Sequence, residues 1–476
     1  MLLILLLFIP VSIHSAPTDQ VKRIDPLLEQ QKKYLDIIKK AYNKKYPEAQ
    51  NETDYPSVAS LNKNRLGLRD KQPLSIPEIN AEISDYLYQS DLLLTEEQAI
   101  SIAKSIENDN NRTKRQAVTN PNYLWDKNQP IHYEFRASLN PAHLPIIRRG
   151  IKFWNDNTCL DFKRDDTAPD RLSIFAGDGC YTYYGKRSRV QDLSIGYYCE
   201  QFATVTHEIM HALGFTHHQL RDDRDDHIIL NVRNIKKEDQ SNFAKTPLSD
   251  GQLLNIPYDY GSVMHYYPSV YANDTSKFTM MARQPLFQFT MGQLHEPSFT
   301  DILAVNRLYN CASKCPTQLP CSNAGYTDPR NCNQCKCPPY FSGRLCRILA
   351  PGTSPVCNGQ VLHATSVWQS FDGVQRDPST TTNYTRAFTT CNWHIIGIVG
   401  RRVEIKITST HLDNLCFNNC FVRTLEINLG KIEKSGFYVC CRDFLNRVFT
   451  SESDFVALRG YIENLQLRFT VQYRIA

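Results

Sequence analysis

The spacing of apolar residues differs between the two ends of the chain. Near the start, apolar side chains recur at helical spacing in two stretches, residues 27–38 and 92–106. Near the end, apolar and polar residues alternate over 403–407 and 465–475, which predicts strands of a half-buried sheet. The length of 476 residues favours about three domains. We therefore expect a multidomain chain with a helical beginning and an all-β end.

The first residues have the pattern of a secretory signal peptide. Residues 2–9 form an unbroken apolar run closed by Pro10, and the small residue Ala16 offers a cleavage point. This run is far shorter than the roughly 20 apolar residues that span a bilayer, and no later segment is long and apolar enough. We expect a signal peptide over 1–15 and a secreted product with no transmembrane anchor. The net charge of +5 is too small for this length to indicate a nucleic-acid partner.

The sixteen cysteines all lie after residue 158. An even number of cysteines in a secreted chain predicts disulfides rather than free thiols. Sequons for N-glycosylation fit the same compartment and occur at Asn51, Asn111, Asn273 and Asn383.

Residues 16–115 contain no cysteine and end in a dibasic cluster formed by Arg112, Lys114 and Arg115. Arginine at the first and fourth positions of this cluster predicts a furin-type processing site. Cleavage there would make residues 16–115 a propeptide and Gln116 the mature N-terminus. The alternative is a solvated charge cluster in a linker.

Histidines cluster in one short segment, where four of the thirteen in the chain occur. His207 and His211 are four residues apart, which places both imidazoles on one face of an α-helix. Gly214 can adopt a positive φ and end that helix, so that the chain turns and His217 supplies a third zinc ligand. Three protein ligands leave a position for water, and Glu208 stands beside the metal to take its proton. The spacing therefore predicts a water-activating zinc site.

The same segment has the form H-E-x-x-H-x-x-G-x-x-H, the long signature of metzincin proteases. Residues 221–225 read R-D-D-R-D and residues 262–266 read S-V-M-H-Y. Together these motifs resemble the astacin family of zinc metalloendopeptidases over residues 117–311. The resemblance implies an α+β metzincin domain over 116–312 that binds one Zn²⁺ ion and hydrolyses internal peptide bonds.

The resemblance also implies roles for single residues. Tyr266 would be a further zinc ligand that swings away and stabilises the tetrahedral intermediate, while Met264 packs beneath the metal. The less favoured alternative for Tyr266 is a core tyrosine in an aromatic-rich stretch. Two disulfides are implied in this domain, Cys159–Cys311 and Cys180–Cys199.

One position departs from the astacin pattern. His218 stands where astacins usually carry the glutamate that meets the mature N-terminus, and a histidine cannot be that anionic partner. A fourth zinc ligand is the less favoured alternative for His218.

Residues 88–91, Tyr-Gln-Ser-Asp, loosely resemble the F-x-G-D motif of astacin propeptides. By that resemblance Asp91 is a zymogen switch, whose carboxylate takes the water position on zinc. The alternative is that Asp91 caps the segment that follows it.

Two further modules are expected after the catalytic domain. Six cysteines are spaced as in a small disulfide-rich EGF-like module over 313–347, with a zinc knuckle as the alternative. Residues 357–476 resemble an all-β CUB sandwich. The implied pairs are Cys315–Cys332, Cys321–Cys335, Cys337–Cys346 and Cys357–Cys391, and the pairing of Cys416, Cys420, Cys440 and Cys441 stays open.

These features predict a secreted zymogen with an architecture similar to nematode astacins. The expected substrates are extracellular proteins such as those of matrix or cuticle, and the CUB module is expected to bind a protein partner. An inactive adhesion protein is the rival hypothesis, and the intact set of zinc-site residues argues against it. A zinc amidase or deacetylase does not fit the long motif.

Overall fold

The computed structural model describes residues 26–46, 74–107, 120–245, 254–378, 388–410, 420, 423–439, 444–463 and 466–476. The predicted signal peptide, the processing site at Arg112, Lys114 and Arg115, and three of the sequons, at Asn51, Asn111 and Asn383, lie outside these residues. The fourth sequon residue, Asn273, is exposed. Within the described ranges, no helix has both the length and the apolar character needed to cross a membrane.

A mixed six-stranded sheet forms one layer of the catalytic region, in the order β1-β5-β6-β4-β2-β3. Neighbouring strands are parallel except for β5 and β6, which are antiparallel. The strands are β1 (Leu92–Leu93), β2 (Ile131–Phe135), β3 (Phe162–Arg164), β4 (Arg171–Phe175), β5 (Cys180–Tyr183) and β6 (Val190–Ile195). The edge strand β1 therefore comes from the first part of the chain.

Helices α5 (Leu144–Asn157) and α6 (Phe202–Ala212) pack against each other and share one apolar core with the sheet. Trp154 on α5 is fully buried and donates its indole N–H to the carbonyl oxygen of Thr206 on α6, at 3.0 Å. The region is completed by α7 (Phe299–Leu308) and by the hairpin of β7 (Ile228–Leu230) with β8 (Met280–Ala282). Helix α6 therefore packs between α5 and the strands β5 and β6 of the sheet.

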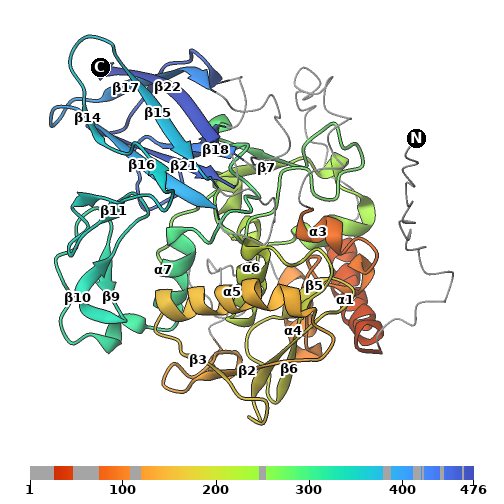
Figure 1. The fold of residues 1–476 in the computed structure, drawn as a ribbon. Coiled ribbons are helices and arrows are strands. Elements are labelled where there is room, and N and C mark those ends of the chain that lie inside the picture. The colour runs from red at the N-terminus through yellow and green to blue at the C-terminus, as the bar shows by residue number, and fades with distance from the viewer. Residues whose placement is uncertain are drawn as a thin grey trace, which may run out of the picture.

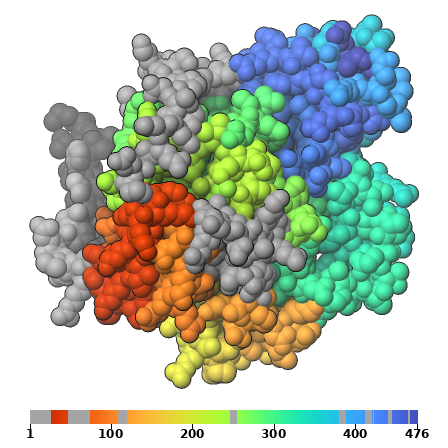
Figure 2. Space-filling view, turned by 180° about the vertical axis from the view of Figure 1, so that it is seen from behind, coloured from red at the N-terminus to blue at the C-terminus, as the bar shows by residue number. Residues whose placement is uncertain are grey.

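The first part of the chain packs against the catalytic region through α1 (Pro26–Lys45), α3 (Ile76–Ile79) and α4 (Glu96–Glu107). Figure 1 shows this part in red and orange beside the sheet, and Figure 2 shows it packed against the yellow and green catalytic region. The helical stretch at 27–38 lies within α1, as its spacing predicts. The second stretch is only partly helical, because Leu92 and Leu93 pair with β5 and α4 begins at Glu96.

A small disulfide-rich region follows the catalytic region. It contains two hairpins, formed by β9 (Tyr326–Asp328) with β10 (Asn331–Lys336) and by β11 (Phe341–Ser342) with β12 (Ile348–Leu349). Its disulfides are Cys315–Cys332, Cys321–Cys335 and Cys337–Cys346. These are the three pairs that the EGF-like resemblance implies.

The C-terminal region is a sandwich of two five-stranded sheets, β13-β15-β22-β17-β20 and β14-β16-β21-β18-β19. Its strands are β13 (Val356–Cys357), β14 (Val361–His363), β15 (Gln369–Arg376), β16 (Thr389–Ile396), β17 (Val403–Thr410), β18 (Arg423–Asn428), β19 (Phe437–Val439), β20 (Phe449–Thr450), β21 (Phe455–Ile462) and β22 (Gln466–Ile475). The two alternating stretches of the sequence form β17 and β22, as predicted.

The sandwich contains the disulfide Cys357–Cys391. Cys420 is also disulfide-bonded. The other three cysteines of this group, Cys416, Cys440 and Cys441, lie outside the described residues, so their pairing stays open.

The three regions share apolar cores rather than meeting only at linkers. Phe278 and Phe289 of the catalytic region belong to the core of the C-terminal sandwich. Tyr340 and Phe341 of the disulfide-rich region pack with Ala457 of the sandwich. In Figure 1 the sandwich lies directly beside both other regions.

Candidate active site

The candidate zinc-binding histidines are placed by α6 and the turn that follows it. His207 and His211 lie one turn apart on this fully buried helix. Gly214 has a φ of 98°, a conformation that favours glycine, and the chain reverses there so that His217 approaches the same point. The three imidazole rings lie within 5.2 Å of one another, centre to centre.

Each histidine is oriented by a hydrogen bond from its Nδ1 atom. The acceptors are the carbonyl oxygen of Val263 for His207, at 2.8 Å, and that of Phe215 for His211, at 2.7 Å. His217 donates to the Oε1 atom of Gln89, at 3.0 Å. Burial lowers the pKa of His217 to about 3, although the charge of Asp91 opposes this shift. Neutral rings with the proton on Nδ1 leave a lone pair on every Nε2.

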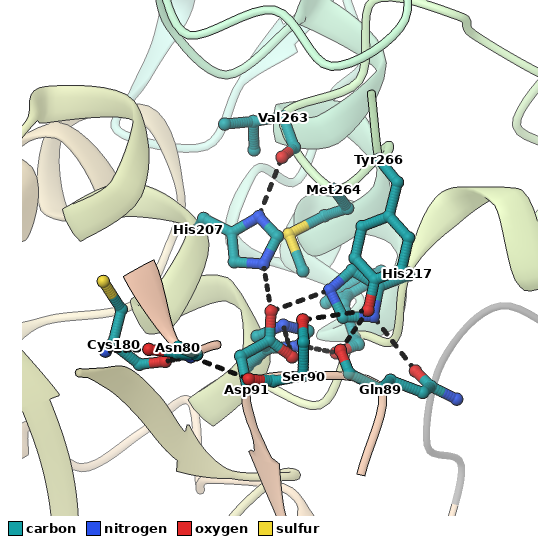
Figure 3. A network of polar contacts seen from close by, with 12 residues as sticks. Asn80, Gln89, Ser90, Asp91, Cys180, His207, His217, Val263, Met264 and Tyr266 are labelled. Atoms are coloured by element: carbon teal, nitrogen blue, oxygen red, sulfur yellow. Dashed lines mark hydrogen bonds and ion pairs between the residues drawn. The ribbon is translucent and has the colours of Figure 1, made fainter. Parts of the chain in front are cut away.

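The carboxylate of Asp91 lies at the point where these three Nε2 atoms converge (Figure 3). Its Oδ2 atom is 3.3 Å from Nε2 of His207 and 3.0 Å from Nε2 of His217. Its Oδ1 atom is 3.4 Å from Nε2 of His211. One ligand atom from each of these four buried residues can be chosen so that all lie within 4.8 Å of one another.

This donor set fits a zinc ion. Three imidazole nitrogens and a carboxylate oxygen are ligand types that zinc prefers, and bonds of about 2.0–2.1 Å separate tetrahedral ligand atoms by roughly 3.3 Å. Moreover, Nε2 of His211 and Oδ1 of Asp91 are buried without a hydrogen-bond partner among the described residues. With the proton of each ring on Nδ1, the lone pairs that converge here suit a bound cation. His207, His211, His217 and Asp91 would therefore hold zinc in this state.

Glu208 lies next to this cluster on α6 and is fully buried. Neither of its carboxylate oxygens has a hydrogen-bond partner in the described part of the chain. Burial, and after it the negative charge of Asp91, raises the pKa of Glu208 well above its ordinary value. A raised pKa makes this carboxylate a stronger base than an exposed glutamate, which suits a group that accepts and returns a proton.

We call residues 88–93 the blocking segment. It contains Asp91, crosses the site and ends with the two residues of β1. The amide of Thr182 on β5 donates to the carbonyl oxygen of Asp91 at 3.0 Å. Gln89 and Ser90 have positive φ angles, 53° and 73°. This local turn aims the Asp91 side chain at the histidines rather than at the amides of the next helix, so it does not cap α4.

The sequence is similar to a known family of proteins. Residues 117–310 match the astacin family of peptidases. Zinc metalloproteinase nas-28 of Caenorhabditis elegans is 44% identical over 440 residues, which cover 92% of this chain and 88% of nas-28. The chain belongs to the astacin family. It is therefore a zinc metalloproteinase.

Two further matches have lower sequence identity. Zinc metalloproteinase nas-29 of Caenorhabditis elegans is 33% identical over 85% of this chain and 78% of its own length. Among solved structures, high choriolytic enzyme 1, a hatching enzyme zinc-protease from the medaka fish Oryzias latipes, is 30% identical. It covers 42% of this chain and 99% of its own, with a TM-score of 0.38.

Tyr266 of this astacin lies beside the histidines, and its ring centre is 4.3 Å from that of His217. Its hydroxyl donates to the carbonyl oxygen of Gln89 and lies 3.2 Å from the hydroxyl oxygen of Ser90. In this state the hydroxyl is thus engaged with the blocking segment. Met264 is fully buried in the same core as α6.

His218 is excluded from the ligand cluster by its own hydrogen bonds. Its Nε2 atom accepts from the amide of Asp259 at 3.0 Å, and its amide donates to the carbonyl oxygen of Met264 at 2.8 Å. The less favoured alternative, in which His218 is a fourth ligand, does not match this orientation. His218 instead ties the zinc-binding turn to residues 259–264.

Three residues of the site have no counterpart in the sequence expectations. Gln89 orients His217, as described above. Asn80 holds the blocking segment in place by donating to the carbonyl oxygen of Ser90 at 2.7 Å while bonding both backbone groups of Cys180. Asp301 accepts from Ser262 and Val263, at 2.6 and 2.8 Å. Only Asp301 had a sequence signal, the S-x-x-D pattern of a helix N-cap, which gives no hint of this contact.

Proposed function

We propose that this astacin is a secreted zymogen in which Asp91 keeps the peptidase inactive. The observation that carries the proposal is the position of the Asp91 carboxylate, which meets the Nε2 atoms of all three histidines. A carboxylate in that position excludes both water and the carbonyl group of a substrate. Cleavage in the cluster of Arg112, Lys114 and Arg115 would allow residues 16–115 to leave.

In the released enzyme, zinc held by His207, His211 and His217 supplies Lewis acidity to activate water and polarise the peptide carbonyl. Glu208 accepts the proton of the attacking water and returns it to the leaving amine nitrogen. Departure of Asp91 removes one of the two causes that raise the pKa of Glu208, which favours the ionised base. The hydroxyl of Tyr266, freed from Gln89, donates a hydrogen bond to the developing oxyanion.

The finer domain assignments belong to the same proposal. Residues 1–15 are a signal peptide, 116–312 the peptidase domain, 313–347 an EGF-like module and 357–476 a CUB module. The disulfides fit an extracellular protein, in which the exposed Asn273 would carry a glycan, as would Asn51, Asn111 and Asn383. Substrates are extracellular proteins, with matrix or cuticle proteins as the first candidates, and the CUB module binds a protein partner.

The test compares the full chain before and after processing on a protein substrate, with and without a zinc chelator. The processed chain should cleave internal peptide bonds, and chelation should stop it. Glu208→Gln should lower the rate by a factor on the order of 10²–10⁴. Glu452→Gln, which changes an exposed glutamate of the sandwich, serves as the matched control. Cleavage that survives Glu208→Gln would refute the mechanism.

A further inference from the structure

A loop of the C-terminal sandwich contacts the turn formed by residues 259–263, which lies next to the zinc-binding histidines. We call residues 429–436, between β18 and β19, the supporting loop. The amide of Ser435 donates to Oδ1 of Asp259 at 3.2 Å, and its hydroxyl donates to Oδ2 at 3.3 Å. The next amide, that of Gly436, donates to Oε1 of Glu426 on β18, at 2.6 Å. Two consecutive residues therefore bridge buried carboxylates from two different regions.

Asp259 depends on these donors because its carboxylate is almost fully buried, at 1% exposure. Its other donors are the amide of Gly261 at 3.0 Å and the hydroxyl of Thr300 at 2.7 Å. Among the described residues, no lysine or arginine forms an ion pair with Asp259. Neutral hydrogen-bond donors must therefore stabilise a buried carboxylate, and Ser435 supplies two of the four.

Asp259 opens a turn that contacts the zinc-binding segment at two points. Its amide donates to Nε2 of His218, the residue next to His217. At the other end of the turn, the carbonyl oxygen of Val263 fixes the ring of His207. A shift of this turn would therefore move His207 directly and would disturb the backbone next to His217.

The supporting loop also fits closely against the middle of the turn. A Cβ atom at Gly261 would lie 2.3 Å from Oγ of Ser435 and 2.5 Å from its Cβ. Both distances are far below van der Waals contact, so only glycine allows the loop to sit there.

We propose that Ser435 is a positioning residue of the peptidase, and that the C-terminal sandwich is part of the scaffold that holds the zinc ligands. This inference rests on the proposed zinc-peptidase mechanism and deepens it. It differs from the expectation that a C-terminal module acts only by binding a partner. Outer groups that orient metal ligands typically change metal affinity or activity by about 10–100-fold when they are lost.

The test uses the processed full chain and measures two quantities, the rate of zinc loss to a chelator and the separate values of kcat and KM. Gly261→Ala should push the supporting loop away, speed zinc loss by about tenfold and lower kcat more than KM changes. Adding Ser435→Gly removes both clashing atoms but also the hydroxyl donor, so it should restore zinc retention from the Gly261→Ala level to about that of Ser435→Ala. A double variant no better than Gly261→Ala would overturn the proposal.

Two further variants keep the test decisive. Ser435→Ala removes one donor without a clash, so it should speed zinc loss even if Gly261→Ala fails to fold. Arg459→Gln breaks the 2.9 Å ion pair with Glu296, which joins the same two regions through side chains other than Ser435 and Asp259, and should leave zinc loss unchanged. An equal effect of Arg459→Gln, or no effect of Ser435→Ala, would contradict a positioning role. Zinc retention without any cleavage by the unsubstituted chain would instead count against the proposed peptidase function.

Discussion

The blocking segment and the C-terminal sandwich both contact the zinc site of this astacin, and their contacts differ in kind. The blocking segment enters from the first part of the chain, adds two residues to the sheet edge and places a charged side chain among the ligands. The C-terminal sandwich shares an apolar core with the catalytic region and supports the site through hydrogen bonds from Ser435 to Asp259. The first part of the chain shares apolar cores with the catalytic region as well. The difference therefore lies at the ligands, because the blocking segment enters the ligand cluster whereas the sandwich contacts a turn outside it.

The largest expected effect concerns the shared core. Phe289 is buried at 6% exposure and meets Phe444 of the sandwich edge to face, with ring centres 6.5 Å apart. Phe289→Ala should lower the free energy of unfolding by about 3 kcal/mol, measured by denaturant unfolding. Tyr197→Ala, at a side chain that is 71% exposed, is the control. If the sandwich unfolded separately and the catalytic region were unaffected, the result would contradict a core shared by the two regions.

The second prediction removes the blocking charge. Asp91→Ala in the uncleaved chain should raise basal proteolysis by about 100-fold, equivalent to roughly 2.7 kcal/mol. Asp85→Ala removes a negative charge from an exposed position of the same region and should leave latency intact. Unchanged latency in Asp91→Ala would remove that residue from the mechanism.

The third prediction concerns pH and the sandwich side. His295 is buried at 2% exposure, stacks on Tyr461 and has no hydrogen-bond partner for either ring nitrogen among the described residues. Burial, followed by the charge of Arg459, lowers its pKa to about 3. Below the ordinary pKa of about 6.5 the unfolded chain binds the proton first, so stability falls as the pH drops towards 3.

Between pH 7 and pH 5 this group alone should cost about 2 kcal/mol of unfolding free energy. His295→Phe should remove that part of the loss in urea unfolding at the two pH values. An equal loss in both proteins would show that other groups carry the pH dependence.

The smallest expected effect concerns substrate preference at a pocket that the first part of the chain partly covers. A pocket beside His207 is lined by Ile76, Pro77 and Asp91 of the first part of the chain, and by catalytic-region side chains without a carboxylate, which include Val263, Tyr267 and Leu294. In the processed enzyme it should prefer apolar over acidic side chains next to the cleaved bond by about tenfold. Matched peptides with leucine or aspartate at each flanking position measure this, and Leu294→Arg should weaken the preference. A wild-type preference for aspartate would refute it.

The sequence predicts the local parts of this molecule well. The spacing of His207, His211 and His217 around Gly214 specifies one helix and one turn, and the structure brings these residues together as that spacing requires. The strands β17 and β22 follow from simple alternation. These features depend only on residues close to one another in the chain.

The remaining features depend on distant contacts. Leu92 and Leu93 have helical spacing but form a strand, because pairing with β5 outweighs local preference. The contact between Ser435 and Asp259 joins residues 176 positions apart, and no local pattern marks it. The expectation of modules in series likewise could not show that their cores merge.

The left-handed backbone conformation of Gln89 and Ser90 would favour release of the blocking segment over its return. For residues other than glycine, such conformations cost about 1–3 kcal/mol each, and only the surrounding fold keeps these two in place. In the proposed zymogen, a segment released by cleavage would relax and would have to be strained again before it could return. Ser90→Gly would ease that return, so the serine at this position would help to make the proposed activation irreversible.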